Sequence, residues 1–197
     1  MVLSQAKILD TGFDLLVTNG LADLSMRRLA AELQVAPGAL YYHVKNKQHL
    51  LVLLANYILD KKAPKELLMP ADSKDPEAVK ESLIVRGQVL FETIYSIPEF
   101  PEVIRLALAT NPERLKPVAA IAYDAQNMGF EPGEALRRAR MLIHLALSLV
   151  EEAQAIPVLT SLTAEAEENP LQEIPKPVCE AYTADISTAI DGLMLSK

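Results

Sequence analysis

The sequence is poor in the residue types that cross-link a protein or hold a metal. Its 197 residues include one cysteine, Cys179, and three histidines. A single cysteine excludes a disulfide within the chain and any cysteine-based zinc cluster, and so few histidines disfavour a histidine-rich metal site. A chain of this length buries roughly 70% of the surface that its unfolded form exposes, so it needs no such staple. We therefore expect no metal and no cofactor.

Long hydrophobic runs are also missing. The longest apolar stretches, such as residues 50–55, fall far short of the roughly 20 residues that span a membrane. The N-terminus lacks a basic segment followed by an apolar stretch, which is the pattern of a secretory signal peptide. Half of the residues are hydrophobic, so the chain is expected to fold around a core. These features predict a cytoplasmic protein without a membrane segment.

Basic residues are outnumbered over the whole chain but not at its beginning. The net charge is −7, from 19 basic and 26 acidic residues, which taken alone argues against nucleic acid as a partner. Residues 1–62, however, hold seven Lys and Arg against five Asp and Glu. The sequence thus predicts a basic N-terminal module on an acidic body.

Signals for β-strands are nearly absent, whereas signals for helices occur throughout. No Asn-Gly or Asp-Gly turn joins two alternating runs, and apolar residues recur instead at the spacing of a helix face. We expect an all-α fold of nine or ten helices, with helices over about 4–19, 26–33, 37–44, 47–62, 75–97, 99–110, 112–128, 133–155 and 177–195. The prolines and acidic residues of 156–177 predict a surface loop.

Several of these helices have recognisable ends. Ser4, Ser25 and Asn46 each stand where a side-chain oxygen can accept a free N–H of the following helix. Gly20 can end the first helix, because glycine adopts the left-handed backbone that a helix C-terminus favours. Pro37 suits the first position of the third helix, where its missing N–H costs nothing.

Residues 25–44 are typical of a helix-turn-helix, two short helices joined by a tight turn. The predicted buried side consists of Leu29, Ala30, Leu33, Val35 and Leu40. The exposed side presents Arg27, Arg28, Tyr41, Tyr42, His43, Lys45 and Lys47. Cations and tyrosine hydroxyls can bind phosphates while helix edges reach bases. The alternative is a plain helical hairpin with a solvated charged face.

Residues 23–47, from Asp-Leu-Ser-Met-Arg-Arg-Leu to Tyr-Tyr-His-Val-Lys-Asn-Lys, resemble the DNA-binding segment of the tetracycline-repressor (TetR) family. A weaker similarity continues in the body, at Gly129-Phe130, Glu134-Ala135-Leu136, His144 and Val150-Glu151. The resemblance implies an all-α, homodimeric transcriptional repressor that a small-molecule effector releases from a palindromic double-stranded DNA operator. It implies a DNA-binding helix-turn-helix domain over 1–46 and a ligand-binding and dimerisation domain over 47–197.

Carried over position by position, the resemblance implies DNA contacts by Ser25, Met26, Arg27, Pro37, Gly38, Ala39, Tyr41, Tyr42, His43 and Lys47. We expect Arg27 to read a base, because a guanidinium can donate to guanine O6 and N7 together. Tyr42 and Lys47 are expected to hold phosphates. Two residues depart from the family pattern. Met26 replaces a small or hydroxylated residue, and Gln34 stands where glycine is common, so a non-glycine residue at positive φ is expected.

An effector pocket needs apolar walls and a few polar groups. The candidates are Tyr57, Arg86, Phe91, Tyr95, Arg105, Tyr123, His144, Ser148 and Glu152. Arg86 lies within an apolar run, so it could turn inward and pair with an acidic ligand. Alternatively it is exposed, or paired with Glu81 or Glu92. His144 also lies in an apolar run, where a hydrogen-bonded core histidine is favoured over a ligand contact.

Two further expectations concern chemistry. Family members that bind a tetracycline–magnesium chelate use body histidines, and the matching positions here are Ala63 and about Ala107, so we expect no such binding. The chain has no P-loop and no Ser/His/Asp or Cys/His set at suggestive spacing, so it is not predicted to be an enzyme. A DNA-binding regulator without a small-molecule effector, controlled by a protein partner, remains the alternative.

Overall fold

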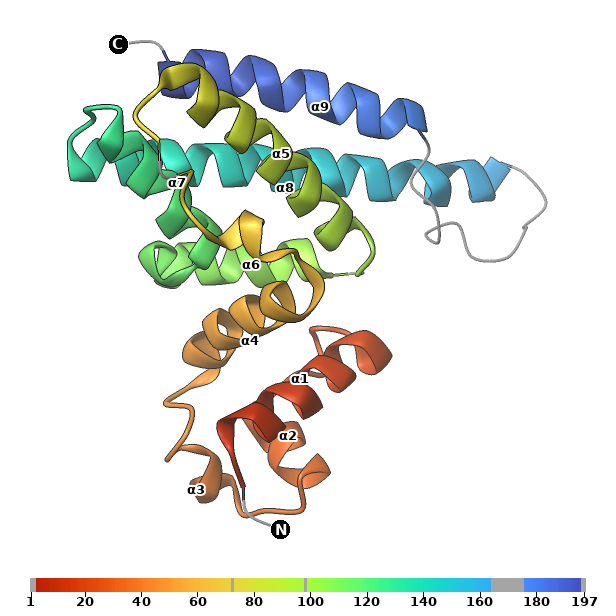
Figure 1. Cartoon of the computed structure of the whole chain (residues 1–197). Coiled ribbons are helices and arrows are strands. Elements are labelled where there is room, and N and C mark those ends of the chain that lie inside the picture. The colour runs from red at the N-terminus through yellow and green to blue at the C-terminus, as the bar shows by residue number, and fades with distance from the viewer. Residues whose placement is uncertain (1–2, 72, 98, 164–175, 196–197) are drawn as a thin grey trace. The chain divides into compact units, whose positions relative to one another are not determined.

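The computed structural model describes residues 3–71, 73–97, 99–163 and 176–195. In these ranges the chain forms nine α-helices and no strand (Figure 1), which confirms the predicted all-α fold. The helices are α1 (Gln5–Asn19), α2 (Met26–Glu32), α3 (Pro37–Leu40), α4 (Lys47–Lys62), α5 (Pro76–Tyr95), α6 (Phe100–Thr110), α7 (Lys116–Asn127), α8 (Pro132–Thr163) and α9 (Lys176–Ile190). No helix in the described ranges is both long enough and apolar enough to cross a membrane.

The helices belong to two compact units. The first unit comprises residues 1–62 and 97–115, and so contains α1 to α4 together with α6. The second comprises residues 63–96 and 116–197, and contains α5, α7, α8 and α9. The chain thus leaves the first unit after α4, builds α5 in the second, and returns to the first for α6.

The core of the first unit forms where α4 packs on α1 and α6. Ile8 and Leu16 of α1, Leu54 of α4, and Val103 and Leu108 of α6 are among its fully buried side chains. Two helix starts are fixed as the sequence predicts. Ser4 Oγ accepts the N–H of Lys7 at 3.3 Å, and Asn46 Oδ1 accepts the N–H of His49 at 2.8 Å. These caps satisfy N–H groups that a helix start leaves unpaired.

In the second unit α5 packs against α8 and α9, and α7 packs against α8. Figure 1 shows α8 and α9 running beside each other in cyan and blue. The apolar stripes of these two helices face largely inward, since Leu142, Ile186 and Ile190 are buried within the chain. Leu145 and Leu149 of α8 are only half-buried and leave apolar surface on the outside of the unit.

Two predicted helix ends are wrong. Helix α3 ends at Leu40 instead of continuing to Val44, because the N–H groups of His43 and Val44 both donate to the Leu40 carbonyl and turn the chain toward α4. Helix α8 runs on to Thr163, so the predicted loop over 156–177 is wrong for residues 156–163, and residues 164–175 of that loop lie outside the described residues. Pro157 lacks one N–H, but that loss does not end a helix of 32 residues.

Candidate nucleic-acid interface and interior cavity

Helices α2 and α3 form the predicted helix-turn-helix. Ser25 caps α2, with its Oγ accepting the N–H of Arg28 at 3.1 Å. The turn is closed by Gln34, whose N–H donates to the Ala31 carbonyl at 3.1 Å and whose φ is 55°. The prediction of a non-glycine residue at positive φ is therefore confirmed. Val35 donates to the Ala30 carbonyl at 3.0 Å, and Pro37 then opens α3.

The buried side of this motif fixes α3 against α2. Leu29, Ala30 and Leu40 are fully buried, as predicted, whereas Leu33 and Val35 are half-buried. These side chains lock the angle between two helices of seven and four residues, which are too short to be stable alone.

None of the ten residues predicted to contact DNA is buried. Arg27, Pro37, Gly38, Tyr41 and Tyr42 are exposed, and Ser25, Met26, Ala39, His43 and Lys47 are half-buried. Tyr42 is 92% exposed and Tyr41 51%. Exposed tyrosines beside cations suit contact with phosphates, because the hydroxyl can donate a hydrogen bond while the ring covers apolar surface.

The two neighbouring arginines of α2 differ in their surroundings. Arg28 is engaged within the motif, with Nε 3.6 Å from Asp23 and Nη2 3.5 Å from Glu32. Arg27 makes no ion pair with any residue that the structure describes, and its side chain is exposed. The guanidinium of Arg27 is thus available to a partner, which fits the predicted role in base reading.

The start of α4 adds a neutral histidine to this basic surface. His49 Nδ1 accepts the N–H of Lys45 at 3.2 Å. Partial burial, together with the positive charges of Arg114 and Lys45, lowers the pKa of His49 below its ordinary value of 6.5. The neutral imidazole is therefore favoured, and it is the neutral form that can accept this hydrogen bond.

The candidate effector residues do not gather at one place. Tyr57 and Arg105 belong to the first unit. The Tyr57 hydroxyl donates to Asp10 of α1, and Lys61 pairs with the same carboxylate at 2.5 Å. Both hydrogen bonds lower the pKa of Asp10, and the one from Lys61 has the larger effect. Tyr57 therefore ties α4 to α1, and Arg105 pairs with Glu102 at 3.5 Å on the surface of α6.

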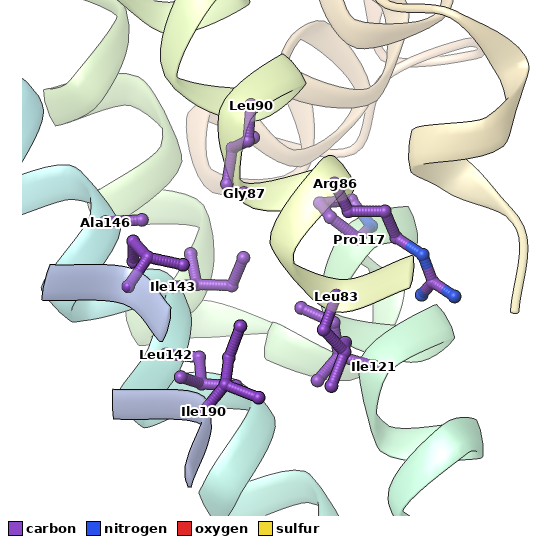
Figure 2. A pocket seen from close by; sticks show the side chains of 11 residues that line it. Leu83, Arg86, Gly87, Leu90, Pro117, Ile121, Leu142, Ile143, Ala146 and Ile190 are labelled. Carbon is purple, nitrogen blue, oxygen red and sulfur yellow. The ribbon is translucent and has the colours of Figure 1, made fainter. Parts of the chain in front are cut away.

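Arg86 lies in the interior of the second unit, beside a cavity of about 30 Å³. Figure 2 shows the aliphatic side chains around this cavity and the Arg86 guanidinium pointing away from them. The walls come from four helices and are formed by Leu83, Arg86, Gly87, Leu90, Pro117, Ile121, Leu142, Ile143, Ala146, Ile186 and Ile190. Apart from Arg86 these residues are apolar, and Arg86 lines the cavity with its aliphatic stem while its guanidinium points away.

The Arg86 guanidinium turns toward α7, where its partner is Asp124 and not Glu81 or Glu92. Nη2 lies 2.7 Å from Asp124 Oδ2 and donates to Ser82 Oγ at 3.1 Å. Asp124 Oδ1 accepts the N–H of Ala71 at 2.8 Å. Arg86 is 4% exposed and Asp124 0%. Among the described residues, Arg86 Nε and Nη1 have no hydrogen-bond partner.

The remaining candidates divide between core and surface. Phe91 and Tyr95 are buried and stacked at 5.6 Å, and Tyr182 of α9 joins them with its ring 4.2 Å from that of Phe91. Phe91, Tyr182 and Glu152 line a second hollow of about 240 Å³ between α5, α8 and α9. Tyr123, His144, Ser148 and Glu152 are exposed.

Asp124 and Tyr182 were missed by sequence reasoning. Asp124 follows the buried Val118 and Ile121 at successive three-residue spacings, which can place all three on one helix face, and that signal was available. In the described part of the chain no cluster of three or more His, Cys, Asp or Glu residues is arranged to hold a metal ion.

The N-terminal region matches a known family. Residues 8–54 match the model of the bacterial regulatory proteins, tetR family. The chain is 29% identical over 158 residues to the class E tetracycline repressor protein of Escherichia coli, covering 78% of this chain and 70% of that protein.

Solved structures share the fold over nearly the whole chain. BioQ from Mycobacterium smegmatis has a TM-score of 0.71 at 23% identity, over 98% of this chain and 99% of that one. BioQ with its double-stranded DNA operator has a TM-score of 0.67 at 23% identity, over 99% and 100%. A variant of TetR from Acinetobacter baumannii AYE in complex with minocycline has a TM-score of 0.64 at 22% identity, over 97% of this chain and 96% of that one.

Proposed function

The chain belongs to the tetR family of bacterial regulatory proteins and is a DNA-binding regulator, and we propose that it is a repressor released from a palindromic operator by a small-molecule effector. The family is one of regulators and not of enzymes, in agreement with the sequence-based prediction. We assign DNA binding to residues 1–46 and effector binding and dimerisation to residues 47–197. The protein acts in the cytoplasm, where the operator lies.

The observation that carries this proposal is the exposed face of the helix-turn-helix and the start of α4, which holds Arg27, Tyr42 and Lys47. Arg27 is exposed and unengaged by the described residues, and Tyr42 is 92% exposed in the same motif. A free guanidinium can read guanine, and the tyrosines and Lys47 bind phosphates. Helix α3 enters the major groove with Pro37, Gly38 and Ala39 toward the bases, where small side chains permit close approach.

A homodimer follows from the symmetry of a palindrome. Two helix-turn-helix motifs bind half-sites about one DNA turn apart, roughly 34–36 Å, so each operator takes two copies. We propose that α8 and α9 supply the dimer contact. Leu145 and Leu149 leave apolar surface outside the second unit, and a four-helix interface would cover it.

An effector in the second unit would act by preferring one conformation of the dimer. Binding shifts the population by the difference in affinity between the two conformations. The hollow of about 240 Å³ lined by Phe91 and Glu152 is the candidate place for it, because the 30 Å³ cavity beside Arg86 has room for little more than a water molecule. The structures of BioQ with its operator and of the TetR variant with minocycline support both ligand classes for the same fold.

Selection of genomic fragments on the purified protein tests the proposal directly. Fragments of the source genome are bound at moderate salt, washed and sequenced. An enriched palindrome with half-sites about one turn apart supports a symmetric dimer, and the adjacent genes indicate the effector's chemistry. Absence of any enriched sequence, together with equal retention by a variant in which Arg27 and Lys47 are replaced by alanine, contradicts operator binding. If a palindrome is enriched but no compound of the chemistry indicated by the adjacent genes releases the protein from it, control by a protein partner is favoured.

A further inference from the structure

The turn between α1 and α2 is held by a side chain from far along the chain. Helix α1 is capped at its C-terminus by Gly20, whose N–H donates to the Leu16 carbonyl at 3.0 Å. The next N–H, that of Leu21, donates to the carboxylate of Glu99. The Leu21 carbonyl in turn accepts the N–H of Leu24. Both polar groups of the Leu21 residue are therefore engaged, one of them by Glu99.

Gly20 and Glu99 fit each other closely. Gly20 has a φ of 80°, and a Cβ added there would lie 2.8 Å from Glu99 Oε1 and 3.2 Å from Oε2. Glycine therefore suits this position for two reasons, because it adopts a backbone with positive φ without strain and because it leaves room for the Glu99 carboxylate. The contact depends on both residues, and a side chain at position 20 would displace the carboxylate from Leu21.

Glu99 is itself held in an uncommon conformation. It stands at the N-cap of α6, where its carbonyl accepts the N–H of Val103 at 3.2 Å. Its φ is 59°, whereas N-cap residues ordinarily adopt extended backbone. Its side chain makes no capping bond to its own helix. Left-handed backbone at a non-glycine residue persists where the surroundings fix it, and the bond to Leu21 is such a constraint.

We propose that Glu99 is a positioning residue for DNA binding, which holds the α1–α2 turn so that α2 and α3 fit the operator. The inference rests on the proposed function. It extends the DNA-binding unit beyond the residues that match the family model, 8–54, to a carboxylate at the start of α6. Glu99 is not among the residues expected to contact DNA, so it acts through the Leu21 N–H.

Substitution of Glu99 by two residues separates this role from general stability. Glu99→Ala removes the acceptor, and Glu99→Gln keeps an oxygen that can accept the Leu21 N–H. Both variants keep a non-glycine residue with positive φ at position 99, so they carry the same backbone strain. Glu102→Ala is the control, because Glu102 is an acidic residue of α6 that contacts Arg105 and not the turn.

Operator affinity, its salt dependence, amide exchange and melting temperature are measured on all four full-length proteins. Glu99→Ala should lose at least tenfold in operator affinity, and its Leu21 N–H should exchange at least tenfold faster. The slope of log affinity against log salt should not change, because no phosphate contact is removed. Glu99→Gln should stay within threefold of the unaltered protein, and Glu102→Ala should match it.

Three outcomes would overturn the inference. Faster Leu21 exchange with unaltered affinity would make Glu99 a structural residue only. Equal losses in Glu99→Ala and Glu99→Gln would mean that the charge and not the hydrogen bond matters. The affinity loss of Glu99→Ala could also accompany a lower melting temperature. If that loss disappears when binding is measured well below the melting temperature, Glu99 contributes to stability alone. If the unaltered protein binds no duplex, the proposed function fails and this inference fails with it.

Discussion

Arg86 of α5 and Asp124 of α7 form an ion pair in the interior of the second unit, with Nη2 2.7 Å from Oδ2. Asp124 has no exposed surface, and its other oxygen accepts the N–H of Ala71. The pair thus joins two helices to the segment that precedes α5. Removing both charges from water is costly, and their attraction offsets the cost only while both are present.

Replacement of Asp124 alone should therefore destabilise the protein strongly. Asp124→Ala leaves the Arg86 guanidinium buried without a counter-charge, and such a change costs about 3–5 kcal/mol of unfolding free energy. Urea denaturation at pH 7 measures the loss. The double variant Arg86→Met/Asp124→Leu removes both charges and should recover most of the stability. If the double variant is no more stable than Asp124→Ala, packing and not the charge dominates the site.

The helix-turn-helix could be predicted because its determinants are local. Ser25 caps α2 by a bond to a residue three positions away, and Pro37 opens α3 through its own fixed φ. Gln34 was expected at positive φ because it stands where the family pattern commonly has glycine. The end of α3 was misjudged because it depends on where α4 begins, which the apolar pattern of residues 41–44 does not specify.

The sites outside this motif depend on contacts between distant segments. Arg86 could be flagged as a charge in an apolar run, but its choice of Asp124 over Glu81 or Glu92 is decided by how α5 packs with α7. Glu99 gives no local signal, since it is an exposed acid before a helix, and its bond to Leu21 exists only in the folded unit. Tyr57, a candidate effector residue, donates a hydrogen bond to Asp10 of α1, a partner 47 residues away that its own segment does not indicate.

Gln34→Gly should stabilise the first unit. Gln34 has a φ of 55°, which costs a side-chain-bearing residue about 1 kcal/mol and glycine almost nothing. Glycine loses more backbone freedom on folding, so the net gain should be up to about 1 kcal/mol. Thermal denaturation of Gln34→Gly and Gln34→Ala separates the relief of backbone strain, which only glycine gives, from the loss of the glutamine side chain, which both variants share. A glycine variant less stable than the alanine variant would show that the Gln34 backbone is not strained.

Arg27→Ala and Arg28→Ala should differ in their effect on the operator. Arg27 is available, so its removal should cost about 1–3 kcal/mol of binding and relax base choice at one position per half-site. Arg28 is engaged by Asp23 and Glu32, so its removal should affect binding less. Titration of each variant against operators substituted one base pair at a time measures this. A uniform loss over all sequences in Arg27→Ala would identify a phosphate contact.

Lys47→Ala should weaken specific and non-specific DNA binding alike. Lys47 begins α4 and is expected to neutralise one phosphate per subunit. Each phosphate that is no longer neutralised should lower the salt slope by about one. Binding isotherms over a range of salt concentrations give the slope for the operator and for a scrambled duplex. An unaltered slope on both would place Lys47 outside the interface.

His49 should make the stability of the first unit depend on pH below neutrality. Its pKa is lowered by partial burial and by the charges of Arg114 and Lys45, so the unfolded chain takes up this proton before the folded one does as the pH falls. The stability that the neutral imidazole contributes is therefore fully present above about pH 6.5 and is lost as the pH falls from there through the folded-state pKa. His49→Gln should remove that part of the pH dependence below about pH 7, whereas His144→Gln, on the surface of α8, should leave it in place. Urea midpoints measured across this range decide the matter, since an identical pH profile for His49→Gln and the unaltered protein would mean that His49 has the same pKa in both states.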